Sequence, residues 1–391
     1  MKMCLSLGER DRRFAAVRSR MSQMGLRALL FAPNTGDWDN FQPGLRYLTS
    51  VGGGGTAAAG VFLADAAPVV AVREGRRVPW WKEAQDWVSD VRFPVDMRWS
   101  RFFLDVLEEH GIDSGRIGVA GLGAVLREHE GTVAHGTMLV LAAALPGVKF
   151  ESAEDLMHDV RKRKSGEEIQ ALEASQILSD AVRTSLRNHA RPGVSEGTVY
   201  AGLHQSYLSG GGEMPTMFLF AAEPRMWQTH LLPNSKRLLC KEDVLIIEAD
   251  TKYLGYTAQA VDTVSLRPFT SIERRLFDIS TECFHLILQA MRPGCPYSEL
   301  VRLWDKTARS AGLKAGRTMG HGLGLGQDGP VTRPAGDAGA LIVEAGDCFV
   351  LKPWISNADD SISARVGGLV IVEEKATRRA GKMELGPYVV Q

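Results

Sequence analysis

Apolar runs and amphipathic stretches alternate over the first 150 residues of the chain. Short apolar runs of the kind that form buried strands occur at 27–33, 59–63, 68–72 and 117–120. Apolar residues recur with helical spacing at 9–24, 101–110 and 134–145. Strands that alternate with helices are typical of an α/β domain, and the glycine run at 52–55 is expected in a loop. We therefore predict an α/β domain over residues 1–155.

A charged stretch separates this part from the rest of the chain. Residues 159–164 include four consecutive basic side chains, and Ser165 stands three residues before Glu168. This Ser-x-x-Glu spacing is a capping box, which predicts a long helix that continues to about His189. We interpret the basic cluster as a solvated surface at a domain junction, because no aromatic residues are interleaved with it. A second domain is expected over residues 156–391.

A short motif occurs twice in this second part. The motif Arg191-Pro-Gly-Val194 returns as Arg292-Pro-Gly-Cys295. An amphipathic helical stretch that ends in small residues and glycine follows each copy. Two copies of one helix-containing unit predict an α+β domain with a pseudo-twofold internal repeat, whose pocket lies between the copies.

The bulk composition narrows the classes of protein. Lys plus Arg and Asp plus Glu each number 46, and 45% of the residues are hydrophobic. This composition excludes a disordered chain, and the zero net charge gives no reason to expect a nucleic-acid or membrane partner. The first residues contain no apolar run of signal-peptide length, and no stretch of about 18 apolar residues occurs. The five cysteines are scattered without a CxxC pair, so we expect reduced thiols and a cytoplasmic location.

Several polar residues interrupt or end apolar runs in the second part. Glu248 and Asp250 end the run 244–250, and side chains two residues apart on a strand project from the same face. Lys352 lies inside an apolar run, where an ammonium needs an anionic partner because burying it alone costs several kcal/mol. Neither His230 nor His321 can be assigned a functional role from its own position, since a lone histidine is usually a hydrogen-bonded structural residue.

The order of these positions resembles that of the creatinase, prolidase and aminopeptidase P superfamily, whose fold is called pita-bread or M24. The resemblance covers nearly the whole chain. Three motifs carry it, namely the junction segment Arg163-Lys-Ser-Gly-Glu-Glu-Ile169, the two Arg-Pro-Gly motifs, and Gly320-His321-Gly-Leu-Gly324, which is similar to the family's GHGxG signature. The resemblance implies a creatinase-like α/β domain at residues 1–155 and a pita-bread α+β catalytic domain at residues 156–391.

The metal peptidases of this superfamily hold their ions with two aspartates, a histidine and two glutamates. The resemblance maps these five ligands, in chain order, onto Glu248, Gln259, His321, Lys352 and Gly367. Only His321 keeps the family's residue type, and a further family histidine corresponds to Asp328. Divalent cations need several oxygen or nitrogen ligands held together, whereas a lysine brings a positive charge and a glycine brings no side chain. We therefore expect neither a metal nor a cofactor.

Creatinase is a metal-free member of the superfamily, and the resemblance to it suggests a general base. Creatinase uses a histidine as its proton carrier, and His230 stands at the matching place. An imidazole takes and returns a proton near neutral pH. Asp262 lies close to the position of an acid that creatinase also uses. The glutamate that creatinase keeps before a proline is Lys352 here, so creatine is not expected as the substrate.

The other catalytic candidates are expected to support this histidine. His321 is expected to orient the substrate or share the proton relay, and Lys352 to supply the positive charge of the missing metal. Glu248, Asp250 and Asp262 are expected to balance that ammonium and to adjust its pKa.

Substrate binding is assigned to residues near these positions in the sequence. Arg365 matches the arginine of the family's Arg-Ile-Glu-Asp strand and is expected to hold an anionic group of the substrate. Asp250 is expected to contact the substrate as well, and Trp227 and Trp354 to form an apolar wall.

These expectations describe a metal-independent hydrolase that cleaves a C–N bond in a small polar molecule and assembles as a homodimer. A lyase is the enzymatic alternative, because the fold also hosts a dimethylsulfoniopropionate-cleaving enzyme and a histidine beside a lysine suits proton abstraction. A non-catalytic binding module is the alternative from another class, since some relatives resemble this fold without catalysis. A degenerate metallopeptidase is the third alternative.

Overall fold

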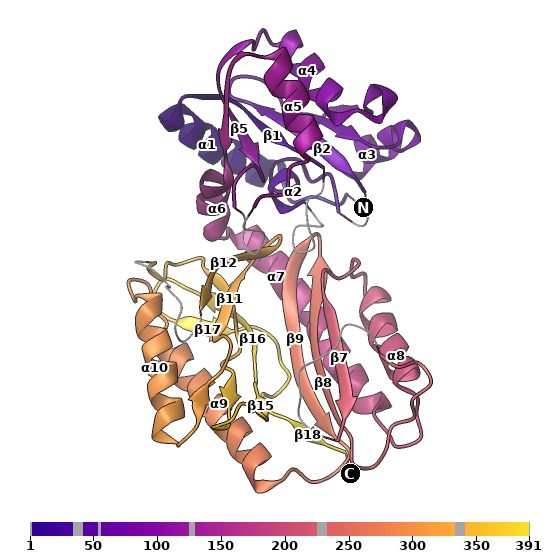
Figure 1. Cartoon of the computed structure of the whole chain (residues 1–391), viewed down its shortest axis with the longest axis vertical. Helices are drawn as coiled ribbons and strands as arrows, with labels where there is room; N and C mark the ends of the chain where they lie inside the picture. Colours follow the sequence, from indigo (N-terminus) through magenta and orange to yellow (C-terminus); the bar gives the residue numbers. More distant parts are fainter. Residues whose placement is uncertain are drawn as a thin grey trace. The chain divides into compact units, whose positions relative to one another are not determined.

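The computed structural model describes residues 2–33, 42–53, 56–124, 130–224, 233–332 and 341–390. The chain divides into two compact units, Met1–Arg161 and Lys162–Gln391 (Figure 1). Trp227 and His230 lie outside the described residues, so the roles expected for them stay predictions. None of the helices in the described part combines the length and the apolar character that a membrane span requires.

Unit 1, Met1–Arg161, is an α/β domain built around one six-stranded sheet of order β4-β3-β2-β1-β5-β6. Its elements are α1 (Leu7–Met24), β1 (Leu26–Phe31), α2 (Pro43–Thr49), β2 (Ala58–Leu63), β3 (Val69–Val72), η1 (Gly75–Arg77), α3 (Val78–Ala84), β4 (Asp90–Arg92), η2 (Val95–Met97), α4 (Trp99–Glu109), β5 (Ser114–Ala120), α5 (His135–Ala144), β6 (Gly147–Ser152) and α6 (Glu154–Lys162). The four predicted strands form the centre of this sheet. The edge strands β4 and β6 are short or largely unburied and carry no apolar run, which explains why the sequence pattern missed them.

Unit 2, Lys162–Gln391, contains four helices and three sheets among its described residues. Its elements are α7 (Gly166–His189), α8 (Glu196–Leu208), β7 (Phe218–Glu223), β8 (Val244–Tyr253), β9 (Tyr256–Ser265), α9 (Ser271–Ala290), α10 (Tyr297–Ser310), β10 (Lys314–Ala315), β11 (Gly320–Leu323), β12 (Gln327–Thr332), β13 (Cys348–Leu351), β14 (Ile355–Ser356), β15 (Ser363–Ala364), β16 (Gly368–Val372), β17 (Thr377–Arg379) and β18 (Tyr388–Val389). The two larger sheets have the orders β18-β9-β8-β7 and β12-β11-β13-β16-β17.

A capping box opens the first helix of each half of unit 2. We call 166–265 the first half and 271–379 the second half. Ser165 and Glu168 cap each other's backbone N–H groups at the start of α7, as the spacing predicts. Thr270 and Glu273 do the same at the start of α9. The second capping box was not singled out from the sequence, although its spacing is the same.

The two Arg-Pro-Gly motifs make the same contact in both halves. Gly193 has a φ of 85° and its N–H donates to the carbonyl oxygen of Leu239 at 2.8 Å. Gly294 has a φ of 91° and its N–H donates to the carbonyl oxygen of Val343 at 2.9 Å. A positive φ favours glycine because a Cβ is strained there. The repeated motif therefore encodes the same turn twice, and the prediction of an internal repeat is confirmed.

Each half packs its helices on one face of its own sheet (Figure 1). α7 and α8 bury an apolar face of β7, β8 and β9, including Leu245, Ile247 and Ala260. α9 and α10 bury residues of β13 and β16, such as Phe349 and Val370. The opposite face of β8 and β9 carries polar side chains instead, and those side chains form the candidate site.

Candidate functional site

The β8–β9 hairpin decides which polar residues share a face. Its turn, Leu254-Gly255, has positive φ values of 49° and 82°, as a two-residue hairpin turn requires. The resulting register places Asp250 opposite Gln259, and Glu248 opposite Val261. Residues that lie opposite each other on antiparallel strands project from the same face. Glu248, Asp250 and Gln259 therefore point together into the interior of unit 2.

Asp262 lies on the other face of the hairpin, which corrects its expected place in the site. It pairs with Ile247, whose side chain belongs to the apolar core under α7 and α8. The Asp262 carboxylate accepts hydrogen bonds from Arg187 at 2.9 and 3.1 Å and lies 3.4 Å from Arg183. The structure thus uses this acid to hold α7 against the sheet and does not bring it to Lys352.

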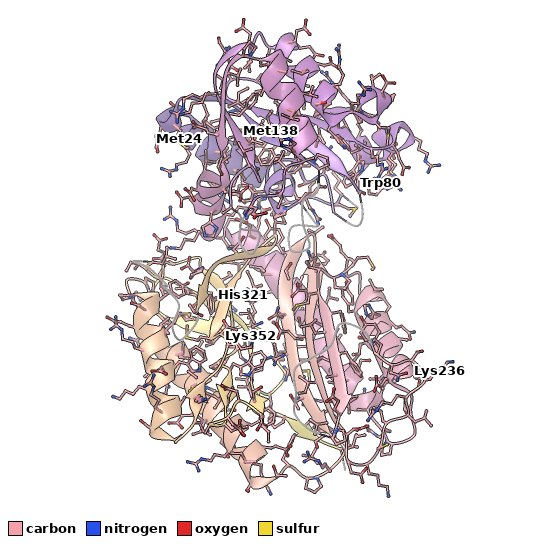
Figure 2. All side chains as sticks on the ribbon, viewed as in Figure 1. Met24, Trp80, Met138, Lys236, His321 and Lys352 are labelled. Carbon is pink, nitrogen blue, oxygen red and sulfur yellow. The ribbon has the colours of Figure 1, made fainter. Side chains whose placement is uncertain are left out.

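The second half contributes His321 and Lys352 from neighbouring strands. His321 lies on β11 opposite Val350 of β13, and Lys352 follows the end of β13 (Figure 2). Gly320 permits this approach, because a Cβ there would lie 2.0 Å from the Val350 carbonyl oxygen. His321 Nδ1 lies 3.0 Å from the Gly322 carbonyl oxygen. The glycine before the histidine is therefore a packing requirement of the two strands.

Lys352 is the centre of a buried hydrogen-bonded cluster. Its Nζ donates to Glu248 Oε1 at 2.6 Å and to Gln259 Oε1 at 2.5 Å. Arg365 Nη2 lies 2.8 Å from the other oxygen of Glu248. The Arg365 guanidinium also lies 4.1 Å from the centre of the Trp354 ring, a cation–π contact. One carboxylate thus faces two cations, and Trp354 contacts the second of them.

Charge pairing decides the ionisation of Glu248. Burial alone would raise the pKa of its carboxyl group, but the charges of Lys352 and Arg365 outweigh burial and lower the pKa to about 2. Burial lowers the pKa of Lys352, and Glu248 counteracts that effect. Glu248 is 7% exposed and Lys352 is 3% exposed, so water screens the attraction between them little.

Asp250 has a different environment, although it shares the face. Its Oδ1 accepts a hydrogen bond from Gln259 Nε2 at 2.9 Å, whereas its Oδ2 is buried and has no hydrogen-bond partner among the described residues. Burial raises the pKa of Asp250 to about 6, against the opposing effects of Gln259 and two lysines. A carboxylate with this pKa accepts a proton or a donor group near neutral pH.

Gln259 was mapped from the sequence onto a family ligand position, but it was given no catalytic or binding role of its own. Its amide donates to Asp250 and its carbonyl accepts from Lys352. The signal was available, because a two-residue turn at Leu254-Gly255 fixes the register of the hairpin. That register places Gln259 on the face of Asp250 and excludes Asp262 from it.

The described residues do not fit a divalent metal centre. Among them, no group of three or more His, Cys, Asp or Glu side chains is arranged to hold an ion. The Lys352 ammonium already fills the space between Glu248 and Gln259. Asp328, at a further family histidine position, is engaged by Lys164 at 2.9 Å. A cation added to this cluster would face an ammonium instead of an anionic ligand.

Substitution of Gly367 by alanine is expected to destabilise the protein by about 1–3 kcal/mol. A Cβ at this position would lie 2.6 Å from the Lys352 Cβ and 2.7 Å from the Leu351 carbonyl oxygen. Gly368→Ala is the matched control, since a Cβ there meets nothing within 4 Å. Urea denaturation of both variants measures the difference. Equal free energies of unfolding would show that the strands yield freely around Lys352.

Within the described part of the chain, Lys352 and Asp250 each leave a group that a ligand can use. An ammonium has three N–H donors, and Glu248 and Gln259 accept two from Lys352. Asp250 Oδ2 is an unused acceptor. A donor beside a second cation stabilises negative charge on a carbonyl oxygen in a buried site. The arrangement is therefore suited to a ligand that carries both an oxygen acceptor and an N–H donor.

Curated relatives with similar sequences have the names of peptidases. The chain is 24% identical over 184 residues to a Xaa-Pro dipeptidase of Pyrococcus furiosus, which covers 45% of the chain and 51% of the relative. It is 23% identical over 218 residues to methionine aminopeptidase 1A of Arabidopsis thaliana, covering 53% and 54%. The chain thus spans about half the length of these relatives.

Solved structures confirm the pita-bread fold over nearly the whole chain. The X-Pro aminopeptidase of Thermotoga maritima matches with a TM-score of 0.80 at 17% identity, covering 96% of the chain and 99% of that structure. Dipeptidase PepE of Mycobacterium ulcerans matches with a TM-score of 0.77 at 22% identity, covering 99% of both. The predicted fold class, an α/β domain followed by a pita-bread α+β domain, is correct.

The same comparisons overturn the function expected from the sequence. A metal-independent hydrolase of a non-peptide C–N bond conflicts with relatives that are dipeptidases and aminopeptidases. The model of metallopeptidase family M24 matches residues 170–374, more than half of the chain. This chain therefore belongs to metallopeptidase family M24.

Proposed function

We propose that this protein is a hydrolase of peptide-like substrates that carry a free amino group. Membership of family M24 and the likeness to a Xaa-Pro dipeptidase and a Xaa-Pro aminopeptidase support hydrolysis of peptides. One observation of the site carries the proposal, namely the unused N–H of Lys352 and the unused Asp250 Oδ2 in one buried cluster. A dipolar ligand satisfies both groups, and a purely apolar ligand satisfies neither.

The two unused groups are joined through one side chain. Gln259 accepts from Lys352 and donates to Asp250, so the three side chains form a continuous hydrogen-bonded row. In this proposal the Lys352 ammonium donates to the carbonyl oxygen of the substrate, and Asp250 accepts from its amino group. Gln259 is a positioning residue, because it fixes the separation of these two contacts.

A peptide panel with and without a blocked amino terminus tests this function. Purified full-length protein is assayed on dipeptides, including Xaa-Pro dipeptides, and on their N-acetylated forms, with added Mn²⁺ or with chelator. We expect cleavage of the free forms, with kcat/KM for the acetylated forms lower by a factor of about 100 or more, since acetylation removes the positive charge that pairs with Asp250 and leaves one N–H. Binding of free peptides without cleavage in either condition would overturn the hydrolase and leave a binding module. Equal cleavage of both forms would overturn the role of Asp250.

We also propose that the protein is a homodimer that buries an apolar surface of unit 1. Four large apolar side chains are about half exposed there, namely Trp80, Phe93, Val95 and Met97. Figure 2 labels Trp80 at the periphery of unit 1. Trp80 lies on α3, which contacts β4, and the other three side chains follow β4 in the chain. Exposed apolar side chains on neighbouring elements are typical of protein interfaces.

Light scattering after gel filtration is expected to give twice the chain mass of 42.7 kDa. Phe93→Asp is expected to give monomers, because a buried unpaired carboxylate disfavours association. Lys236→Asp, a change on an exposed side chain of unit 2, is the control. A monomeric wild-type protein would contradict the proposal, and so would a dimer that Phe93→Asp leaves intact.

A further inference from the structure

The two halves of unit 2 begin their central strands in the same way. The N–H of Leu266 donates to the carbonyl oxygen of Asp243 at 2.9 Å. The N–H of Val372 donates to the carbonyl oxygen of Asp347 at 2.9 Å. Each aspartate immediately precedes a strand, β8 in the first half and β13 in the second. Asp243 and Asp347 therefore occupy equivalent positions of the internal repeat.

Opposite charges stand at the next pair of equivalent positions. Glu248 lies five residues after Asp243, and Lys352 lies five residues after Asp347. The two side chains meet, with Lys352 Nζ 2.6 Å from Glu248 Oε1. Two acids at these positions would repel each other and would need a cation between them. Here the second half supplies the cation itself.

The surroundings of the pair are adapted to an ammonium. Gln259 presents its carbonyl oxygen to Lys352. A neutral amide, like a carboxylate, accepts a hydrogen bond from an ammonium, but it adds no charge. Gly367 leaves room for the lysine, because a Cβ there would lie 2.6 Å from the Lys352 Cβ. Arg365 takes the second oxygen of Glu248. Each oxygen of Glu248 therefore contacts a cation.

We infer that Lys352 is a built-in cation at the interface between the two halves and that the wild-type cluster excludes divalent cations. Replacing Lys352 with glutamate and Gln259 with aspartate would then create a site for one. The site would take a hard divalent cation such as Mn²⁺, held by carboxylates from both halves. Cation binding is measured without any peptide substrate, so its result does not depend on whether the protein cleaves peptides.

Binding of Mn²⁺ to the full chain, measured by electron paramagnetic resonance of the free ion, tests the inference. The double variant Lys352→Glu, Gln259→Asp is expected to bind one Mn²⁺ at least about 100-fold more tightly than the wild type. Adding Glu248→Gln to the double variant is expected to abolish that binding. Mn²⁺ is also expected to raise the melting temperature of the double variant and not that of the wild type.

Lys352→Gln is the matched control, since it removes the ammonium without adding a carboxylate, and no gain in Mn²⁺ binding is expected. A folded double variant that binds Mn²⁺ no better than the wild type would overturn the inference. A wild-type protein that binds one Mn²⁺, with binding lost in Glu248→Gln, would overturn it as well. The wild-type titration needs no folded variant, so the inference stays testable if the double variant does not fold.

Discussion

Lys352→Met is expected to lower the free energy of unfolding by about 3–5 kcal/mol at neutral pH. The substitution keeps most of the side-chain volume but leaves Glu248 buried without the ammonium that contacts it at 2.6 Å. Arg365 remains beside the other oxygen and limits the loss. Urea denaturation measures the change.

Acid is expected to reduce the effect of this substitution. Glu248 has its folded-state pKa lowered from 4.5 to about 2. A lowered pKa contributes stability that is present above pH 4.5 and is lost as the pH falls towards 2. The difference between the wild type and Lys352→Met should therefore shrink over that window.

Lys314→Met is the control for Lys352→Met. Lys314 pairs with Asp360 at 3.3 Å, and both side chains are half exposed or more. An exposed pair of this kind contributes about 0–1 kcal/mol. If both lysine variants lost the same small free energy, Lys352 would not be the counter-ion of a buried carboxylate.

Asp250→Asn is expected to stabilise the protein at pH 7 and to weaken substrate binding at the same time. The folded-state pKa of Asp250 is raised from 3.8 to about 6. Folding therefore takes up a proton, and the stability from this group is present below pH 3.8 and lost as the pH rises through 6. The free energy of unfolding of the variant minus that of the wild type should therefore be about 2 kcal/mol larger at pH 7 than at pH 4.

The effect of Asp250→Asn on KM distinguishes a role in substrate binding from a role in stability alone. If Asp250 accepts the amino group of a substrate, Asp250→Asn should raise KM for free dipeptides and leave that for N-acetylated dipeptides unchanged. Enzymes commonly keep a residue that lowers the stability of the fold because the residue is needed for activity. The measurements are denaturation at both pH values and KM for both substrate forms. A stability change that does not depend on pH would contradict the raised pKa of Asp250 as its cause. An unchanged KM would contradict the contact between Asp250 and the amino group.

The position of the charge pair shows where sequence reasoning stops. A lysine inside an apolar run required an anionic partner, and this much followed from the cost of burying an ammonium. The partner, Glu248, is 104 residues away in the chain. No local pattern specifies which of several acids approaches Lys352, because the docking of the two halves decides it.

The sequence by itself determined the fold class, the internal repeat and the start of α7. Capping boxes, positive-φ glycines and apolar periodicity act over a few residues, so they are readable locally. The alternation of side chains also placed Glu248 and Asp250 on one face before their neighbours were known.

Only the tertiary structure decided the membership of the site. A hairpin register turned Asp262 towards α7 and Gln259 towards Lys352, since a shift of one residue reverses the face. The surroundings then separated two acids of one strand. The charges of Lys352 and Arg365 outweigh burial and lower the pKa of Glu248, whereas burial raises the pKa of Asp250. These outcomes depend on which side chains surround each carboxylate in space, and the order of residues along the chain does not contain that information.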